Sequence, residues 1–332
     1  MYELRVLDAA QFRSLVFMDD VIPGVEEAYK LFSSGRAGLF PIITHEFDPG
    51  RSDMDIKSGY LDGAGIYGLK ILGWNADNPA ALGVPALAGL IVIMDLQRQQ
   101  PVGILEGTPV TFLRTGAAGA LGARTFARPD SERAVIVGAG AQGRAQLLGL
   151  SRVMGHLKTV DLFDMNEAST QKMADEVKAQ YPGLEISARK FADLERYVRQ
   201  ADIVTTCTPS KKPLIKYGWA APGTHINAVG ADMPGKQEFE SSVVATSKLF
   251  CDSRQQVALK GECQHAVSEG LDPQGITEIG EVLNGIKPGR ASDDEITLFD
   301  ATGMALQDLI TGKVALERAA AAGIGTVIRM EQ

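Results

Sequence analysis

Apolar and polar residues follow two different patterns along the chain, and the first pattern covers the amino-terminal third. Apolar residues at helical spacing predict a helix from Val21 to Phe32, ended by Gly35. Short apolar runs between Gly, Pro and Asp residues then predict strands at 68–74, 89–95 and 101–106. The first third is therefore expected to be rich in β-structure.

The second pattern is a regular alternation of strands and helices. A run of Ala, Gly, Leu and Arg at 108–128 predicts a closely packed helix, and an apolar strand, a glycine turn and a helix then follow from Arg133 onward. Such alternation indicates a parallel sheet covered on both faces, so the fold class is α/β with a doubly wound domain. The remaining strands are expected at 159–164, 184–189, 202–208, 225–231, 248–253 and 296–303, with helices at 167–181, 192–199 and from 304 onward.

Length and charge narrow the possible partners. A chain of 332 residues exceeds the usual size of one compact core, so two domains are expected. The net charge of −8 provides no basic surface for phosphate backbones, which argues against a nucleic-acid partner. The longest apolar run, 85–94, is about half as long as a membrane-spanning helix. The N-terminus lacks the basic segment followed by an apolar segment that would direct export. We therefore expect a cytoplasmic protein with no membrane partner.

The three cysteines do not indicate a disulfide framework or a metal site. Cys207, Cys251 and Cys263 are odd in number and form no CxxC pair, which argues against a zinc site. We expect all three to be small core residues.

The glycine turn after the first strand of the second pattern carries the clearest chemical signal. Gly138, Gly140 and Gly143 form GxGxxG directly between a strand and a helix, and the next strand ends in Asp164. This context predicts a dinucleotide site at a helix N-terminus, and Asp164 favours NAD over NADP because it would repel a 2′-phosphate. The alternatives are a glycine turn that binds nothing and a solvated Asp164. The turn and helix start that would contact the cofactor also include Ala141 and Gln142.

The segments around this motif resemble those of the ornithine cyclodeaminase/mu-crystallin family. The similar runs are FLRTGAAGALGARTFARPDSERAVIVGAGAQGRAQL, INAVGADMPGKQEF, IGEVLNGIKPGR and ITLFDATGMALQDL. The resemblance implies a homodimer in which residues 1–115 and 304–332 form a smaller α+β domain for substrate binding and dimerisation. It also implies that residues 116–303 form an NAD-binding Rossmann domain, and that the chemistry takes place at a carbon bearing nitrogen beside a carboxylate.

The resemblance also implies roles for individual residues. Lys70 and Asp232 match the family's catalytic lysine and aspartate, and Arg114 matches an arginine that binds the substrate's α-carboxylate. Without the resemblance, Lys70 would be an edge-strand lysine, Arg114 a structural ion pair and Asp232 a turn residue. Further candidates for cofactor contacts, at strand ends or turns, are Thr115, Thr206, Asn227, Gly230 and Thr302.

Two departures from the family bear on the substrate. Where many relatives have a second carboxylate-binding arginine after a proline, this chain has Pro41 followed by IITH, and Lys57 stands where relatives often have methionine. Lys57 and His45 are therefore expected to line the substrate pocket and to favour an anionic or small substrate, unless Lys57 is a solvated loop residue. We expect an NAD(H)-dependent imine reductase or L-amino-acid dehydrogenase acting on iminosuccinate, the imine of alanine or a cyclic ketimine acid. The alternatives are an ornithine cyclodeaminase without net NAD turnover and a nucleotide-bound protein without catalysis.

Overall fold

The computed structural model describes residues 2–330, which fold into two compact units. The first unit joins the residues up to Arg114 with those from Met304 onward, and the second unit is Thr115–Gly303. The boundary between the units falls within helix α4 (Gly107–Phe126). This helix confirms the one predicted at 108–128. Within the described residues, no helix has both the length and the apolar character that a membrane span requires.

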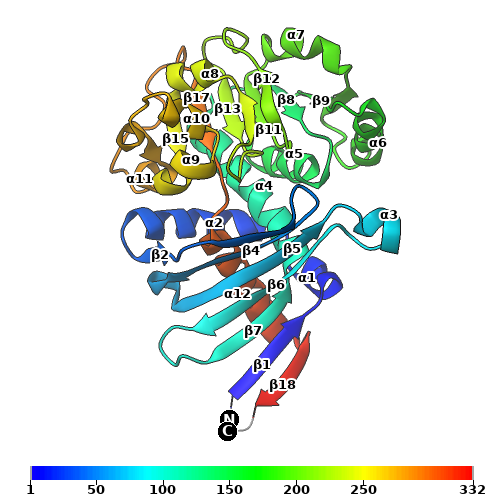
Figure 1. The fold of residues 1–332 in the computed structure, drawn as a ribbon, viewed down its shortest axis with the longest axis vertical. Coiled ribbons are helices and arrows are strands. Elements are labelled where there is room, and N and C mark those ends of the chain that lie inside the picture. Colours follow the sequence, from blue (N-terminus) through cyan, green and yellow to red (C-terminus); the bar gives the residue numbers. More distant parts are fainter. Residues whose placement is uncertain (1, 331–332) are drawn as a thin grey trace. The chain divides into compact units, whose positions relative to one another are not determined.

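The first unit is built on one large, mostly antiparallel sheet (Figure 1). Its strand order is β18-β1-β7-β6-β5-β4-β2, with β3 paired to β4, and only β1 and β7 run parallel. The strands are β1 (Tyr2–Leu7), β2 (Ala37–Leu39), β3 (Ile43–Asp48), β4 (Ser52–Leu61), β5 (Ile66–Asn75), β6 (Leu87–Asp95), β7 (Pro101–Glu106) and β18 (Thr326–Met330). The three strands predicted here are confirmed.

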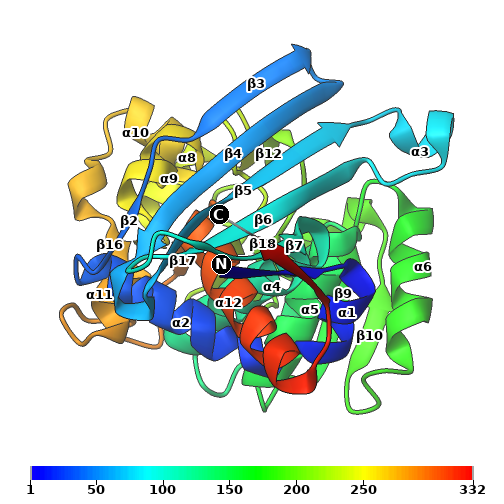
Figure 2. The same cartoon turned by 90° about the horizontal axis from the view of Figure 1, so that it is seen from below.

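Helices cover one face of this sheet. Helix α12 (Ala305–Ala322) packs on β4, β5, β6 and β7 and lies beside α2 (Met18–Ser33), as Figure 2 also shows. Helix α2 starts three residues earlier than predicted, because Asp20 accepts a hydrogen bond from the Phe17 N–H and caps its first turn. The smaller helices are α1 (Ala9–Leu15) and α3 (Asn78–Leu82).

Strand register separates the two faces of the sheet. The row Leu7, Leu105, Ile91, Lys70 and Lys57 runs across five strands on the helix-covered face, and each of these residues is buried. A row on the opposite face consists of Leu90, Ile71, Ile56 and Ile43, of which Leu90, Ile71 and Ile43 are exposed. The first unit thus has an apolar sheet face that its own helices do not cover.

The second unit confirms the doubly wound parallel sheet. Its order is β10-β9-β8-β11-β13-β17-β15-β16, and every pair is parallel. The order reverses direction at β8, which is the arrangement of Rossmann domains. The strands are β8 (Arg133–Val137), β9 (Thr159–Phe163), β10 (Glu185–Ala188), β11 (Ile203–Thr206), β13 (His225–Ala228), β15 (Lys248–Cys251), β16 (Thr277–Glu278) and β17 (Thr297–Asp300).

Two apolar clusters cover the two faces of this sheet. One contains residues of α5 (Ala141–Val153) and α6 (Glu167–Lys178), and the other contains residues of α7 (Leu194–Val198), α8 (Ser241–Thr246), α9 (Arg254–Lys260) and α10 (Cys263–Ser268). The unit also has α11 (Ile279–Leu283) and a two-stranded sheet of β12 (Lys211–Ile215) and β14 (Gln237–Phe239). Cys251 and Cys263 lie in the core as predicted, whereas Cys207 is only partly buried.

Candidate functional site

A buried group of charged side chains lies between the sheet and α12 of the first unit. Lys70 on β5 lies 2.9 Å from Asp308 on α12, measured from Nζ to Oδ2, and the Arg114 Nε donates to the other oxygen of Asp308 at 3.0 Å. Lys70 is 1% exposed and Asp308 is not exposed at all. One carboxylate therefore holds Lys70 and Arg114, two of the cations predicted to act on the substrate.

Neutral polar groups complete this arrangement. The Arg114 Nη1 donates to the Gln307 Oε1 at 3.3 Å, and the Gln307 amide donates to the Tyr29 hydroxyl at 2.7 Å. The Lys70 Nζ also donates to the Thr111 hydroxyl at 3.4 Å. These contacts restrict the rotamers of Lys70 and Arg114 before any ligand binds.

Lys57 belongs to the same group. It is the direct cross-strand neighbour of Lys70, is 8% exposed, and lies 3.7 Å from Asp55 between Nζ and Oδ2. Because Lys57 sits within β4 on the helix-covered face, it is not a solvated loop lysine. Lys57, Lys70 and Arg114 share Asp55 and Asp308, so these five groups carry one more positive than negative charge.

His45 does not join this group. It pairs with Met54 across β3 and β4, and Met54 points to the opposite face of the sheet from Lys57 because side chains alternate along a strand. His45 is exposed there, with its ring 5.0 Å from that of Phe47. The expectation that His45 lines a pocket together with Lys57 is therefore wrong within one copy of the chain.

Burial and neighbouring charges shift the ionisation of the central pair. Burial, Arg114 and Lys57 lower the pKa of Lys70, burial having the largest effect, and Asp308 raises it; together they bring the pKa to about 8. Burial alone would raise the pKa of Asp308, but Arg114 and Lys70 hold it below its usual value. Asp308 therefore stays ionised near neutral pH, whereas Lys70 can gain or lose a proton there.

Asp308 and Gln307 were not among the residues predicted from the sequence. Both lie in the stretch MALQDLI, on a helix whose first eight residues are all buried. The sequence does show an aspartate and a glutamine at the start of a largely apolar helix. Because buried polar groups require partners, this pattern could have indicated a buried polar cluster. Those partners lie on β5, α4 and α2, about 200 to 280 residues earlier in the chain.

The glycine turn of the second unit has the geometry that each glycine requires. Gly138 has a φ of +113°, a conformation that residues with a Cβ rarely adopt. A Cβ on Gly143 would lie 2.0 Å from the Gly138 carbonyl oxygen, so only glycine lets α5 approach β8 this closely. A Cβ on Gly140 would meet no atom within 4 Å, so open space lies beside the backbone at the start of α5.

The groups around this turn suit a dinucleotide. The two oxygens of Asp164 accept from the Ala139 and Asn166 N–H groups, both at 2.9 Å, which holds the carboxylate beside the turn. The buried Oε1 of Gln142, in the first turn of α5, has no hydrogen-bond partner in the described chain. A helix N-terminus with open space and a fixed carboxylate is the arrangement that holds a pyrophosphate and a ribose diol.

Three further cofactor candidates have their side chains committed inside the second unit. Thr206 donates to Glu238 at 2.6 Å, Asn227 donates to the Gly119 carbonyl at 2.9 Å, and Thr302 donates to Asp252 at 3.1 Å. All three are 2% exposed or less. Thr206 and Thr302 link segments at strand ends and Asn227 links β13 to α4, and a contact of these residues with the cofactor stays a prediction.

The other two candidates are held through their backbones. The Gly230 N–H donates to Glu238 at 3.0 Å, and the Thr115 carbonyl accepts from Gln146 at 2.9 Å. Asp232, which follows Gly230, lies 2.5 Å from the Lys236 Nζ through its Oδ1. Asp232 is thus part of an ion pair within its own turn.

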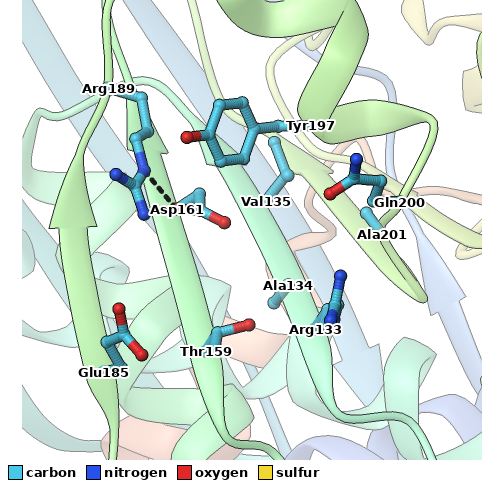
Figure 3. Close-up of a pocket in the computed structure, with 10 residues that line it drawn as sticks. All are labelled: Arg133, Ala134, Val135, Thr159, Asp161, Glu185, Arg189, Tyr197, Gln200 and Ala201. Atoms are coloured by element: carbon cyan, nitrogen blue, oxygen red, sulfur yellow. Dashed lines mark hydrogen bonds and ion pairs between the residues drawn. The ribbon is translucent and has the colours of Figure 1, made fainter.

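A separate pocket lies over the sheet face that α7 covers (Figure 3). Its lining includes Asp161, which accepts from the Arg189 Nε at 2.6 Å, and the Arg189 guanidinium lies 4.9 Å from the Tyr197 ring centre. Burial raises the pKa of Asp161. None of the glycine-turn residues lines this pocket, so it is not the predicted dinucleotide site.

Comparison with known proteins supports the same interpretation of the fold. Three solved structures cover 97–99% of this chain, and the chain covers 99–100% of each of them. They are an archaeal alanine dehydrogenase dimer with bound NAD (35% identity, TM-score 0.92), the Thermococcus litoralis Δ1-pyrroline-2-carboxylate reductase with NADH and L-proline (31%, 0.91), and the Paracoccus denitrificans iminosuccinate reductase with NAD⁺ (26%, 0.91). The model of the ornithine cyclodeaminase/mu-crystallin family matches residues 3–323, and the chain belongs to this family.

Proposed function

We propose that this protein is an NAD(H)-dependent oxidoreductase that interconverts a small 2-imino acid and the corresponding L-amino acid. The observation that carries the proposal is the group formed by buried Lys57, Lys70, Arg114 and Asp308 with the partly exposed Asp55, whose excess positive charge suits a carboxylate ligand. The three similar structures, each named for chemistry on such acids and solved with this cofactor, support the same reaction class.

The glycine turn, Gln142 and Asp164 are the residues that would hold NAD, which when bound supplies or accepts the hydride. The open space at Gly140 leaves room for phosphates at the start of α5. Each oxygen of Asp164 accepts one backbone N–H and keeps a further lone pair for a ribose hydroxyl. A 2′-phosphate would be repelled by this carboxylate, so NAD is favoured over NADP by about tenfold or more, on the order of 1.4 kcal/mol.

The first unit would bind the substrate and handle a proton. Arg114 uses its Nε and Nη1 in the contacts above, so the rest of the guanidinium is available to the substrate's α-carboxylate. Lys70, with its pKa near 8, can donate a proton to the imine nitrogen during reduction and take it back during oxidation. Asp232 would exchange protons with solvent through its partly exposed carboxylate.

Lys57 favours a substrate with a second carboxylate. It is buried beside Lys70, and its contact with Asp55 at 3.7 Å is long for an ion pair. A dicarboxylic imine such as iminosuccinate would give this ammonium a second anionic partner. The imine of alanine and a cyclic ketimine acid are the smaller alternatives.

A cofactor-turnover assay tests the proposal. NADH oxidation would be followed with 2-oxo acids plus ammonia or methylamine, with iminosuccinate and with cyclic imino acids, and each assay would be repeated with NADPH. We expect net NADH consumption and at least about tenfold weaker use of NADPH. Ornithine conversion to proline and ammonia without net NADH change would instead support the cyclodeaminase alternative.

We further propose that the protein is a homodimer formed through the uncovered sheet face of the first unit. The row containing Ile43, Ile71 and Leu90 offers exposed apolar side chains across three strands. An isologous pairing of two such faces would bury these side chains without any other partner.

A further inference from the structure

The Asp232 turn contains a second charged residue whose position suggests a role. The Lys236 Nζ lies 2.5 Å from the Asp232 Oδ1 and also donates to the Gly230 carbonyl at 3.4 Å. The side chain of Lys236 is 19% exposed and that of Asp232 is 43% exposed. Lys236 therefore links the carboxylate to the backbone on the other side of the same turn.

The neighbouring helix holds this turn in place. The Gln264 side chain accepts from the Gly235 N–H at 2.8 Å and donates to the Lys236 carbonyl at 3.2 Å, and a nitrogen of His265 lies 3.1 Å from that same carbonyl. Gly235 has a φ of +79°, which suits glycine. Because the backbone at Lys236 is held at several points, its ammonium is already positioned beside Asp232 and need not be recruited by a ligand.

Carboxyl and basic side chains surround the turn that holds the Lys236 ammonium. Glu238 lies on β14 and Glu262 lies directly before α10, and both are buried. The Glu238 carboxylate accepts a hydrogen bond from the Gly230 N–H. Burial raises the pKa of both carboxyl groups. Lys236 forms an ion pair with Asp232, and His265 contacts the Lys236 carbonyl. An adjacent ammonium favours the ionised form of a carboxyl group, so the Lys236 Nζ, 2.5 Å from the Asp232 Oδ1, favours ionised Asp232.

We propose that Lys236 is a positioning residue that keeps the Asp232 carboxylate ionised and fixed in its turn, so that Asp232 can accept a proton near neutral pH. The proposal rests on the proposed function, in which Asp232 exchanges protons during the interconversion of imine and amine. Lys236 itself acts through Asp232 and does not contact the reacting atoms in this role.

Substitution of Lys236 tests the role by a charge-dependent readout. Lys236→Met should move the acidic limb of the pH profile of kcat/KM upward by about one pH unit and lower kcat at pH 7 by roughly tenfold. Lys236→Arg keeps the charge and should remain within about threefold of the wild type. The affinity for NAD, measured by fluorescence titration, should change by less than about twofold in both variants, because neither removes a residue of the glycine turn.

A matched control and a direct measurement make the test decisive. Lys30→Met removes the ammonium of another i,i+4 pair, with Glu26 on α2, and should leave the pH profile unchanged. The ¹³Cγ signal of Asp232, assigned by its loss in Asp232→Asn, should titrate at higher pH in Lys236→Met than in the wild type. If the wild type reduces no imino acid, the proposed function fails, yet this titration still decides whether Lys236 controls Asp232.

An unchanged Asp232 titration in Lys236→Met, or an acidic limb that stays in place, would overturn the proposal. An equal loss of activity in the Met and Arg variants would also overturn it, since that would indicate packing and not charge. Should Lys236→Met fail to fold, Lys236→Gln removes the charge while keeping a polar end for the Gly230 carbonyl.

Discussion

Asp308 is the residue on which the buried charges of the first unit depend. It lies against Lys70 and Arg114 and has no exposed surface, so its loss would leave two buried cations without their main partner. Removing one member of a buried ion pair typically costs about 3–5 kcal/mol. The effect on activity should be specific, because Asp308 raises the pKa of Lys70.

We expect Asp308→Asn to lower stability by several kcal/mol and to move the basic limb of the pH profile of kcat/KM to lower pH, since Lys70 would lose its proton more easily. Urea unfolding and steady-state kinetics would measure the two effects. Asp161→Asn is the matched control, because it removes a partly buried, arginine-paired carboxylate from the second unit and should leave that limb in place. An unmoved limb in Asp308→Asn would show that Lys70 does not set it.

Lys57 allows a prediction about substrate choice. If Lys57 binds a second carboxylate, the protein should reduce iminosuccinate with a kcat/KM at least about tenfold above that for the imine of alanine. This ratio corresponds to the free energy of one hydrogen bond to a charged group after its desolvation cost is subtracted. Lys57→Met should abolish this preference and spare the smaller substrate. A substrate ratio that is the same in both proteins would assign Lys57 to the structural pairing with Asp55 alone.

At the scale of elements, the β8–α5 turn depends on the missing side chain of Gly143. A methyl group there would lie 2.0 Å from the Gly138 carbonyl oxygen, so α5 would have to shift away from β8. Gly143→Ala should weaken NAD binding by about tenfold or more and lower the Tm. Gly155→Ala, where a Cβ would meet no atom within 4 Å, should leave both nearly unchanged. Calorimetric titration with NAD and thermal unfolding would measure these effects.

The end of β17 gives a pH-dependent prediction. Burial raises the pKa of Asp300 to about 7, and its Oδ1 has no hydrogen-bond partner in the described chain. The unfolded chain loses this proton near pH 4, so between about pH 4 and 7 the folded state binds more protons and stability falls as pH rises. Asp300→Asn removes this loss and should raise the Tm more at pH 8 than at pH 5. An equal change at both pH values would mean that Asp300 is ionised in the fold without cost.

At the scale of the whole molecule, the uncovered sheet face should control assembly. Leu90→Lys places a charge at the β6 end of the exposed apolar row and should convert a dimer into monomers in analytical ultracentrifugation. Leu82→Lys is a control, because Leu82 is even more exposed but lies on α3 outside this row. A dimer that survives Leu90→Lys would place the interface elsewhere.

The sequence by itself determined the features that depend on local order in the chain. The strand, glycine turn and helix at 133–153, the alternation that follows, and Asp164 at the end of the next strand are all consequences of residues close in sequence. Side-chain periodicity and the conformational freedom of glycine act over a few residues, so a sequence pattern can reveal them. The family resemblance added Lys70, Arg114 and Asp232 as single positions, but not their partners.

Only the tertiary structure decided which charged groups meet. Asp308 reaches Lys70 and Arg114 because α12, near the end of the chain, packs on β5 from its first third. Strand register placed Lys57 beside Lys70 and turned His45 to the opposite face, and a shift of one residue would have reversed both. Register and helix packing depend on contacts between distant segments, and for this reason the local pattern could propose the residues of the site but not their arrangement.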